Sequence, residues 1–237
     1  MLAAIALTPT APVLVSDLAG AAAAEVAEVR EAVVAAAATL PQRWIAVGVG
    51  PVGERIGPDT RGTFAGYGVD VPVALSPEAG SRITAMPLCA LFGAWLRGQA
   101  NPRAIVEVRV CAADLDAAAA VDLGRSLRAE IDEIAEPIGV LVLADGATTL
   151  TPSAPGSHDP DAEAVQSVLD DALAAGDVAA LVRLPDWIAG RVAYQVLAGL
   201  AEPEPWDATE LARSALYGVG YFVGTWVPGQ SGGPPTP

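Results

Sequence analysis

Reactive nitrogen and sulfur side chains are scarce in this chain. Among 237 residues there is one histidine, His158, and lysine is absent, so that all 13 basic residues are arginine. One histidine cannot supply two imidazole ligands, which excludes a two-histidine metal site within a single subunit. The two cysteines, Cys89 and Cys111, are too few for a disulfide framework or a zinc-binding pattern. We expect both to be packing residues, because Cys89 lies in an apolar helical stretch and Cys111 at a strand end.

Positive charge is also in short supply. The chain carries 28 acidic residues against 13 basic ones, a formal net charge of −15. Such a surface repels phosphate backbones and anionic lipids, so we do not expect the protein to bind nucleic acids or membrane surfaces. No apolar run free of breakers reaches the roughly 18 residues of a membrane helix. Met1–Val15 lacks a basic leader and contains Pro9 and Pro12, which predicts a buried strand and a loop in a cytoplasmic, reduced protein.

What the chain does contain is hydrophobic residues, at 52%, in a regular order. Short apolar runs alternate with helical stretches, a pattern typical of α/β layer folds. We predict one α/β domain over residues 1–227, with a central mixed β-sheet, helices on both faces, and strand-end loops lining any cleft. Residues 228–237 are rich in proline and glycine and are predicted to be a disordered tail.

The expected elements follow from periodicity and from residues that begin or break helices. Asp17 stands where the cap of the first helix would be, and Pro87 suits the first residue of another. Strands are expected at Leu2–Leu7, Arg43–Val49, Val69–Leu75, Ala104–Cys111, Ile138–Leu143 and Tyr217–Val227. Helices are expected at Ala21–Leu40, Pro87–Arg97, Leu115–Ile134, Pro160–Ala175, Val178–Leu184, Trp187–Leu200 and Ala208–Leu216.

Gly48, Gly50 and Gly53 follow a predicted strand with the spacing of the dinucleotide-binding fingerprint. That fingerprint works because a helix begins inside it and points backbone amides at the pyrophosphate. Here Glu54–Pro58 cannot open a regular helix, and Pro51 removes an amide donor. We therefore interpret this segment as a plain strand-to-loop turn.

His158 lies among acidic residues, which at first resembles a metal cluster. The simpler interpretation is a helix start, in which Asp159 caps the helix and Pro160 occupies its first turn. Asp161 and Glu163 then face the positive end of the helix dipole. The alternative is that His158 acts as a lone acid/base group over a pocket.

Other polar and aromatic residues have structural interpretations. Asp114 and Asp116 begin a predicted helix and are interpreted as caps. The aromatic side chains are spaced as core or interface anchors. The pair Tyr194 and Gln195 is the exception, because it suggests a polar pocket wall.

Several stretches, in order along nearly the whole chain, together resemble the class III extradiol ring-cleavage dioxygenases, specifically an actinobacterial branch similar to the catalytic subunit of that family. The segments that carry the resemblance are Thr8–Val15, Val47–Pro51, Phe64–Val71, Pro87–Trp95, Ala144–Ala147 with Ala154–Gly156 and Asp159–Pro160, and Tyr217–Trp226.

The resemblance implies an Fe(II) site of two histidines and one glutamate, with a further histidine as acid/base. At the places of the three histidines this chain has Thr10, Gly50 with its neighbours, and Thr148. The family glutamate comes from a late helix, yet no acidic residue lies between Asp186 and Glu202. We therefore expect no metal or other cofactor here, although the family would imply Fe(II).

Three functions remain open. The chain could be a degenerate dioxygenase-like protein that binds a small molecule or a protein partner in the cleft that holds the active site in that family. It could be an accessory subunit of a metal-containing partner chain, and a homodimer is plausible by analogy with the superfamily. It could also be a non-redox enzyme, a hydrolase or isomerase, using Asp145, His158 or Tyr194. The candidate cleft residues are Thr10, Gly50, Asp145, Thr148, His158 and Tyr194.

Overall fold

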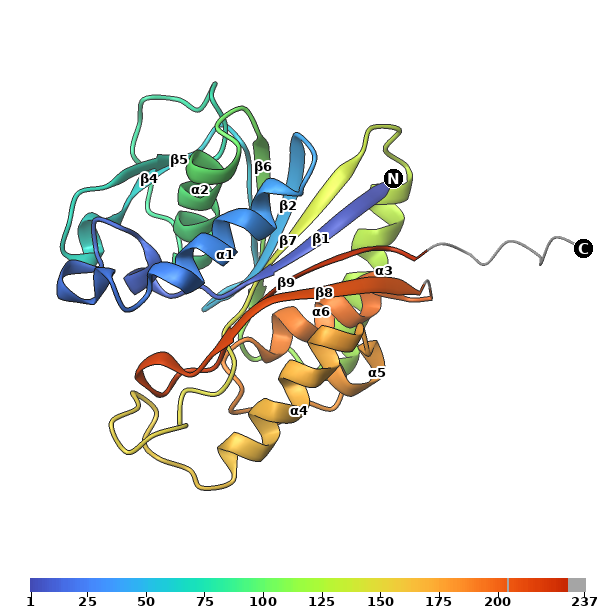
Figure 1. Ribbon diagram of the computed structural model, residues 1–237. Helices are drawn as coiled ribbons and strands as arrows, with labels where there is room; N and C mark the ends of the chain where they lie inside the picture. Colours follow the sequence, from blue (N-terminus) through green and yellow to red (C-terminus); the bar gives the residue numbers. More distant parts are fainter. Residues whose placement is uncertain (204, 230–237) are drawn as a thin grey trace, which may run out of the picture.

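The computed structural model describes residues 1–203 and 205–229 and forms one α/β domain (Figure 1). Its strands are β1 (Leu2–Thr8), β2 (Arg43–Gly50), β3 (Glu54–Ile56), β4 (Arg61–Thr63), β5 (Pro72–Ala74), β6 (Ile105–Ala112), β7 (Ile138–Leu143), β8 (Trp206–Ser214) and β9 (Tyr221–Pro228). Its α-helices are α1 (Ala27–Ala38), α2 (Leu88–Ala100), α3 (Ala117–Asp132), α4 (Ala162–Ala175), α5 (Val178–Leu181) and α6 (Arg191–Ala201).

The central sheet has seven strands in the order β3-β6-β2-β7-β1-β9-β8. The four inner strands β6, β2, β7 and β1 are mutually parallel, while β3 at one edge and β9 and β8 at the other run antiparallel to their neighbours. β4 and β5 form a separate two-stranded ribbon. The predicted mixed sheet is therefore confirmed, with its antiparallel strands confined to the edges.

Both faces of the sheet are covered by helices, as predicted. Figure 1 shows α1 and α2 on one side and α3, α4, α5 and α6 on the other. Successive strand residues point to opposite faces. Accordingly, Leu141 and Leu143 of β7 pack in the cluster under α1 and α2, while Val140 and Val142 pack in the cluster under α3 and α6.

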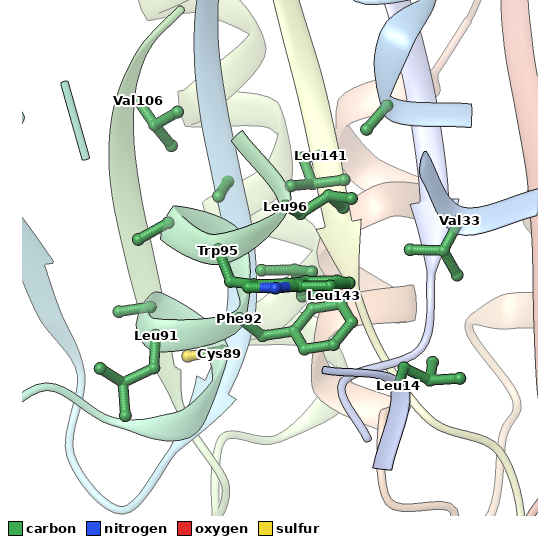
Figure 2. Packing of buried hydrophobic residues seen from close by; sticks show 14 of the residues in the cluster. Leu14, Val33, Cys89, Leu91, Phe92, Trp95, Leu96, Val106, Leu141 and Leu143 are labelled. Atoms are coloured by element: carbon green, nitrogen blue, oxygen red, sulfur yellow. The ribbon is translucent and has the colours of Figure 1, made fainter. Parts of the chain in front are cut away.

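The first cluster is built around α2. Phe92, Trp95 and Leu96 lie against Leu141 and Leu143 of the sheet (Figure 2), and the Phe92 and Trp95 rings are 5.3 Å apart. All five side chains are at most 4% exposed. Because β7 is buried on both faces, its sequence is a continuous apolar run, which is why the sequence predicts this strand with its observed bounds.

On the other face, α3 and α6 pack closely because each has a glycine at the contact. A side chain at Gly124 would overlap the Val196 carbonyl, and one at Gly199 would overlap the Val121 carbonyl. The absence of these side chains lets the two backbones approach directly.

One predicted element has the wrong type. The helix expected at Ala208–Leu216 is the edge strand β8, which pairs with β9 from Trp206↔Pro228 to Ser214↔Tyr221. Alanine, leucine and glutamate favour a helix locally, but pairing with β9 outweighs a propensity of a few tenths of a kcal/mol per residue. A register shift between Glu210 and Ala212 also hides the strand alternation.

Several predicted boundaries are also wrong. The helix expected from Ala21 begins at Ala27 after a 3-10 turn, and the one expected from Trp187 begins at Arg191. The short strands β3 and β4 are not among the predicted elements. Within the predicted tail, Pro228 belongs to β9 and the Gly229 amide bonds to the Pro205 carbonyl, while residues 230–237 lie outside the described residues.

The predicted caps are partly confirmed. Asp116 accepts the amide of Ala119 at 2.8 Å and caps α3. Asp159 instead accepts the amide of Asp161, and α4 begins only at Ala162. Pro160 therefore precedes the helix and lies outside its first turn, because Asp159 forms a local turn.

Candidate functional site

A small pocket opens where the carboxyl ends of β1, β2 and β7 meet the beginnings of α2 and α6. Its volume is about 200 Å³. Parallel strands deliver their following loops to one edge of a sheet, which is where ligands bind in open α/β folds. The pocket is lined by Thr10, Val49, Leu88, Cys89, Leu143, Ala144, Asp145, Ala189 and Gly190.

Asp145 is the charged group of this pocket. The Thr10 amide donates a hydrogen bond to its Oδ1 at 3.0 Å, joining the loop after β1 to the loop after β7. Part of the residue surface faces the pocket, while the carboxyl is densely surrounded by protein atoms. Loss of hydration raises the pKa of Asp145 to about 6, against the opposing effect of hydrogen bonds from Thr10.

The loop that carries Asp145 is fixed by backbone hydrogen bonds to the start of α6. The Gly190 amide donates to the Asp145 carbonyl at 2.7 Å, and the Ala189 amide donates to the Gly146 carbonyl at 3.2 Å. A side chain at Gly190 would meet the backbone of this loop. Glycine at this position therefore allows α6 to begin directly behind the pocket.

A buried glutamine supports the same loop from the other side. The Ala147 amide donates to Gln166 Oε1 at 2.8 Å, and Gln166 Nε2 donates to Asp170 Oδ1 at 2.7 Å. Gly146 and Gly220 leave the room that the Gln166 amide occupies. Sequence reasoning misses Gln166, because a glutamine within a helix gives no signal that its amide replaces a missing backbone partner.

The six predicted cleft residues do not gather in one place. Thr10 and Asp145 line the pocket, as expected of a cleft at this edge. Gly50 lies at the end of β2, where a side chain would meet Val110. Thr148 lies further along the loop, and its carbonyl accepts the Gly156 amide at 2.9 Å.

Tyr194 and His158 are outside the pocket lining. Tyr194 is 2% exposed, and its hydroxyl donates to the Ala144 carbonyl at 3.0 Å, so it supports the pocket wall from behind. Burial raises the pKa of Tyr194 well above its usual value. His158 is exposed on the loop before α4. Asp145, His158 and Tyr194 therefore do not form the acid/base group that a hydrolase or isomerase at one cavity requires.

The glycine spacing at the end of β2 has a packing explanation. A side chain at Gly48 would fall on Cys89 of α2. The segment is followed by the strand β3 at Glu54, and no helix begins there. The interpretation of Gly48, Gly50 and Gly53 as a strand-to-loop turn is therefore confirmed.

The donor groups at this edge do not suit ferrous ion. Thr10, Gly50 and Thr148 offer no imidazole nitrogen, and within residues 1–203 and 205–229 no three His, Cys, Asp or Glu side chains are placed to hold a metal ion. Cys89 borders the pocket, but burial raises the pKa of its thiol to about 12, which disfavours the thiolate that binds metals. The residues at the pocket therefore do not fit the iron that the resemblance would imply.

Comparisons with known proteins inform the fold only. No model of a known protein family matches the chain, and no curated protein matches it in sequence. Among solved structures, the uncharacterized protein JW3007 from Escherichia coli K12 is similar, with a TM-score of 0.58 and 13% identity. The match covers 95% of this chain and 99% of the other. At that identity the likeness shows the α/β fold.

Hydrophobicity does not mark a membrane segment in the part of the chain that the structure describes. None of its helices combines the length and the apolar character needed to cross a bilayer.

Proposed function

We propose that this chain binds a small molecule with one polar group and an apolar part in the pocket beside Asp145 and that it does so without Fe(II). The observation that carries the proposal is a carboxyl group of raised pKa that is fixed by Thr10 and lies in a pocket presenting both polar and apolar surface. A pocket that places one charged group next to several apolar side chains is typical of small-molecule sites. The resemblance to extradiol dioxygenases supports the same edge of the sheet as the ligand site.

The size and chemistry of the pocket define the ligand class. A cavity of roughly 150 Å³ holds benzene, so about 200 Å³ suits one substituted ring. Val49, Leu88 and Leu143 would contact the apolar part. Asp145 would accept a hydrogen bond from a hydroxyl or amine group of the ligand, and an amine would in addition favour its ionised form.

The cytoplasm is the proposed location. Cys89 and Cys111 are both unpaired and buried. Secreted proteins commonly use disulfides, so two unpaired thiols support a reducing compartment.

The proposal can be tested by ligand-induced stabilisation. Phenol and aniline are expected to raise the melting temperature more than toluene, which has the same shape without a donor. Ala189→Trp should fill the mouth of the pocket from an exposed position and abolish the response, whereas Ala65→Trp, also at an exposed alanine, should not. Equal responses of wild type and Ala189→Trp would reject this site.

A second measurement addresses iron directly. Metal analysis of the purified protein is expected to find no stoichiometric iron, and added catechol should cause no oxygen consumption. Stoichiometric iron together with ring opening of a catechol would contradict the proposal, whatever the ligand screen shows.

A further inference from the structure

A second hollow has a volume of about 540 Å³ and lies at the start of α6, next to the pocket. Gly190 lines the pocket, and the next residue, Arg191, lines this hollow. We call it the charged groove; its walls are the loop 113–117 between β6 and α3, the segment 182–184 with Asp186, and Arg191 and Gln195 of α6. Gln195, which the sequence indicates as part of a polar wall, is therefore part of a different wall from Tyr194.

Arg191 is the buried cation of the charged groove, with 8% of its surface exposed. Its guanidinium donates to Gln195 Oε1 at 3.0 Å and to the Leu115 carbonyl at 3.1 Å, and its Nε lies 3.3 Å from Asp186 Oδ1. A guanidinium has five N–H groups. The two hydrogen bonds therefore leave three N–H groups without a hydrogen-bond acceptor in the described part of the chain, one of them on the Nε that is ion-paired with Asp186.

The carboxylate that balances Arg191 is poorly held. The Asp186 side chain is 96% exposed, whereas that of Arg191 is 10% exposed. An ion pair with one solvated partner contributes little, while a buried cation gains from a second, better oriented acceptor. A ligand carboxylate could therefore replace Asp186 at low cost.

Charged groups of both signs on this groove lack a partner among the described residues. Arg183 is exposed, and its side chain makes no hydrogen bond or ion pair with that part of the chain. The same holds for the side chain of Asp114. A ligand that carries both a carboxylate and an ammonium group would match this pair, whereas a simple anion would meet Asp114, Asp116 and Asp186 unfavourably.

An apolar hollow lies next to the charged groove. It has a volume of about 340 Å³, shares Arg183 and Leu184 with the groove, and is otherwise lined by apolar residues of α4, α5 and the following loop. Val168 in this hollow is 62% exposed. An apolar side chain attached to the charged ligand could bury surface here.

We propose that the charged groove and this apolar hollow together bind a free apolar amino acid. Its carboxylate contacts Arg183 and the free N–H groups of Arg191, displacing Asp186. Its ammonium group contacts Asp114, and its side chain lies along Val168. This site is separate from the pocket at Asp145 and does not depend on the function proposed for that pocket.

Calorimetric titration with four matched probes tests the ligand class. L-leucine is expected to bind at least about tenfold more tightly than N-acetyl-L-leucine, which lacks the ammonium group, and than L-leucinamide, which lacks the carboxylate. Glycine should also bind more weakly, because it has no side chain for the apolar hollow. N-acetyl-L-leucine binding as tightly as L-leucine, or no binding of L-leucine, would overturn the proposal.

Variants at exposed positions locate the site without threatening the fold. Arg183→Gln and Val168→Ser should each weaken L-leucine binding about fivefold to tenfold, while Arg103→Gln, at another exposed arginine, should not. Asp186→Asn should tighten binding, because it removes the carboxylate that competes for Arg191. A purely structural Arg191–Asp186 pair predicts no gain, so unchanged or weaker binding by Asp186→Asn overturns the displacement step.

Discussion

Asp145 lies on the loop 145–150, and Asp170 is joined to the same loop through Gln166, which also accepts the Ala147 amide. Burial raises the pKa of each to about 6. Asp145 faces the pocket and receives a backbone amide from Thr10. Asp170 lies on α4, receives the side-chain amide of Gln166, and is further influenced by the charge of Arg213.

The comparison shows that a raised pKa does not identify a binding site by itself. Desolvation is the largest cause in both cases, but only Asp145 lines one of the hollows described above. Asp170 already has a fixed donor, so its carboxyl serves the loop 145–150 through Gln166. What distinguishes the two is the free space next to the carboxyl.

Removing the residue that connects Asp170 to the loop 145–150 should have the largest effect. Gln166→Leu leaves the Ala147 amide and the Asp170 carboxyl without their partners, and is expected to lower the free energy of unfolding by about 2–4 kcal/mol. Gln99→Leu, at an exposed glutamine, should change it by less than about 0.5 kcal/mol. Urea denaturation of both variants measures the difference; equal losses would show that the network is not structural.

Asp145→Asn should change the free energy of unfolding by an amount that depends on pH. Because burial raises the folded-state pKa from 3.8 to about 6, the stability that neutral Asp145 provides is present below about pH 4 and lost as pH rises through about 6. Relative to wild type, the variant should therefore gain up to about 3 kcal/mol by pH 7. A difference that is independent of pH would show that the carboxyl is well hydrated in the folded protein.

Tyr194→Phe tests the wall behind Asp145. Loss of the hydrogen bond to the Ala144 carbonyl in a buried site should cost about 1–2 kcal/mol of unfolding free energy. Tyr67→Phe, at a tyrosine that is 45% exposed, should be close to neutral. Thermal unfolding of the two variants makes the comparison, and a neutral Tyr194→Phe would mean that the carbonyl finds water instead.

The smallest expected effect is a change in the pKa of Asp170 that leaves the pKa of Asp145 unchanged. Arg213 lowers the pKa of Asp170 by its charge, so Arg213→Gln should raise the pKa of Asp170 further. The pKa of Asp145 should not change, since its shift arises from burial and Thr10. Carbon-13 NMR of the two carboxyl groups measures both values in one sample; a change at Asp145 would reveal coupling across the loop.

The parallel strands and β9 can be predicted from sequence, and the edge strand β8 cannot. β7 is apolar throughout because it is buried on both faces, so its pattern is unambiguous. β8 is an edge strand whose alternation is interrupted near Leu211, and its composition suits a helix equally well. Only the presence of β9 beside it decides its conformation.

Part of the candidate site can also be predicted from sequence, because some of its residues directly follow predicted strands. Thr10 and Asp145 follow strands and are expected at the same edge of the sheet, where the structure places them. Gln166 and Arg191 act through partners far away in sequence, 19 and 76 residues for Ala147 and Leu115. Spacing along the chain carries no information about such pairs.

The position of β1 has a consequence for how the molecule is made. β1 is flanked by β7 and β9, so its two neighbours come from residues 138–143 and 221–228. During synthesis this apolar strand therefore leaves the ribosome long before either neighbour exists. Closure of the sheet awaits the last strand, which predicts slow folding.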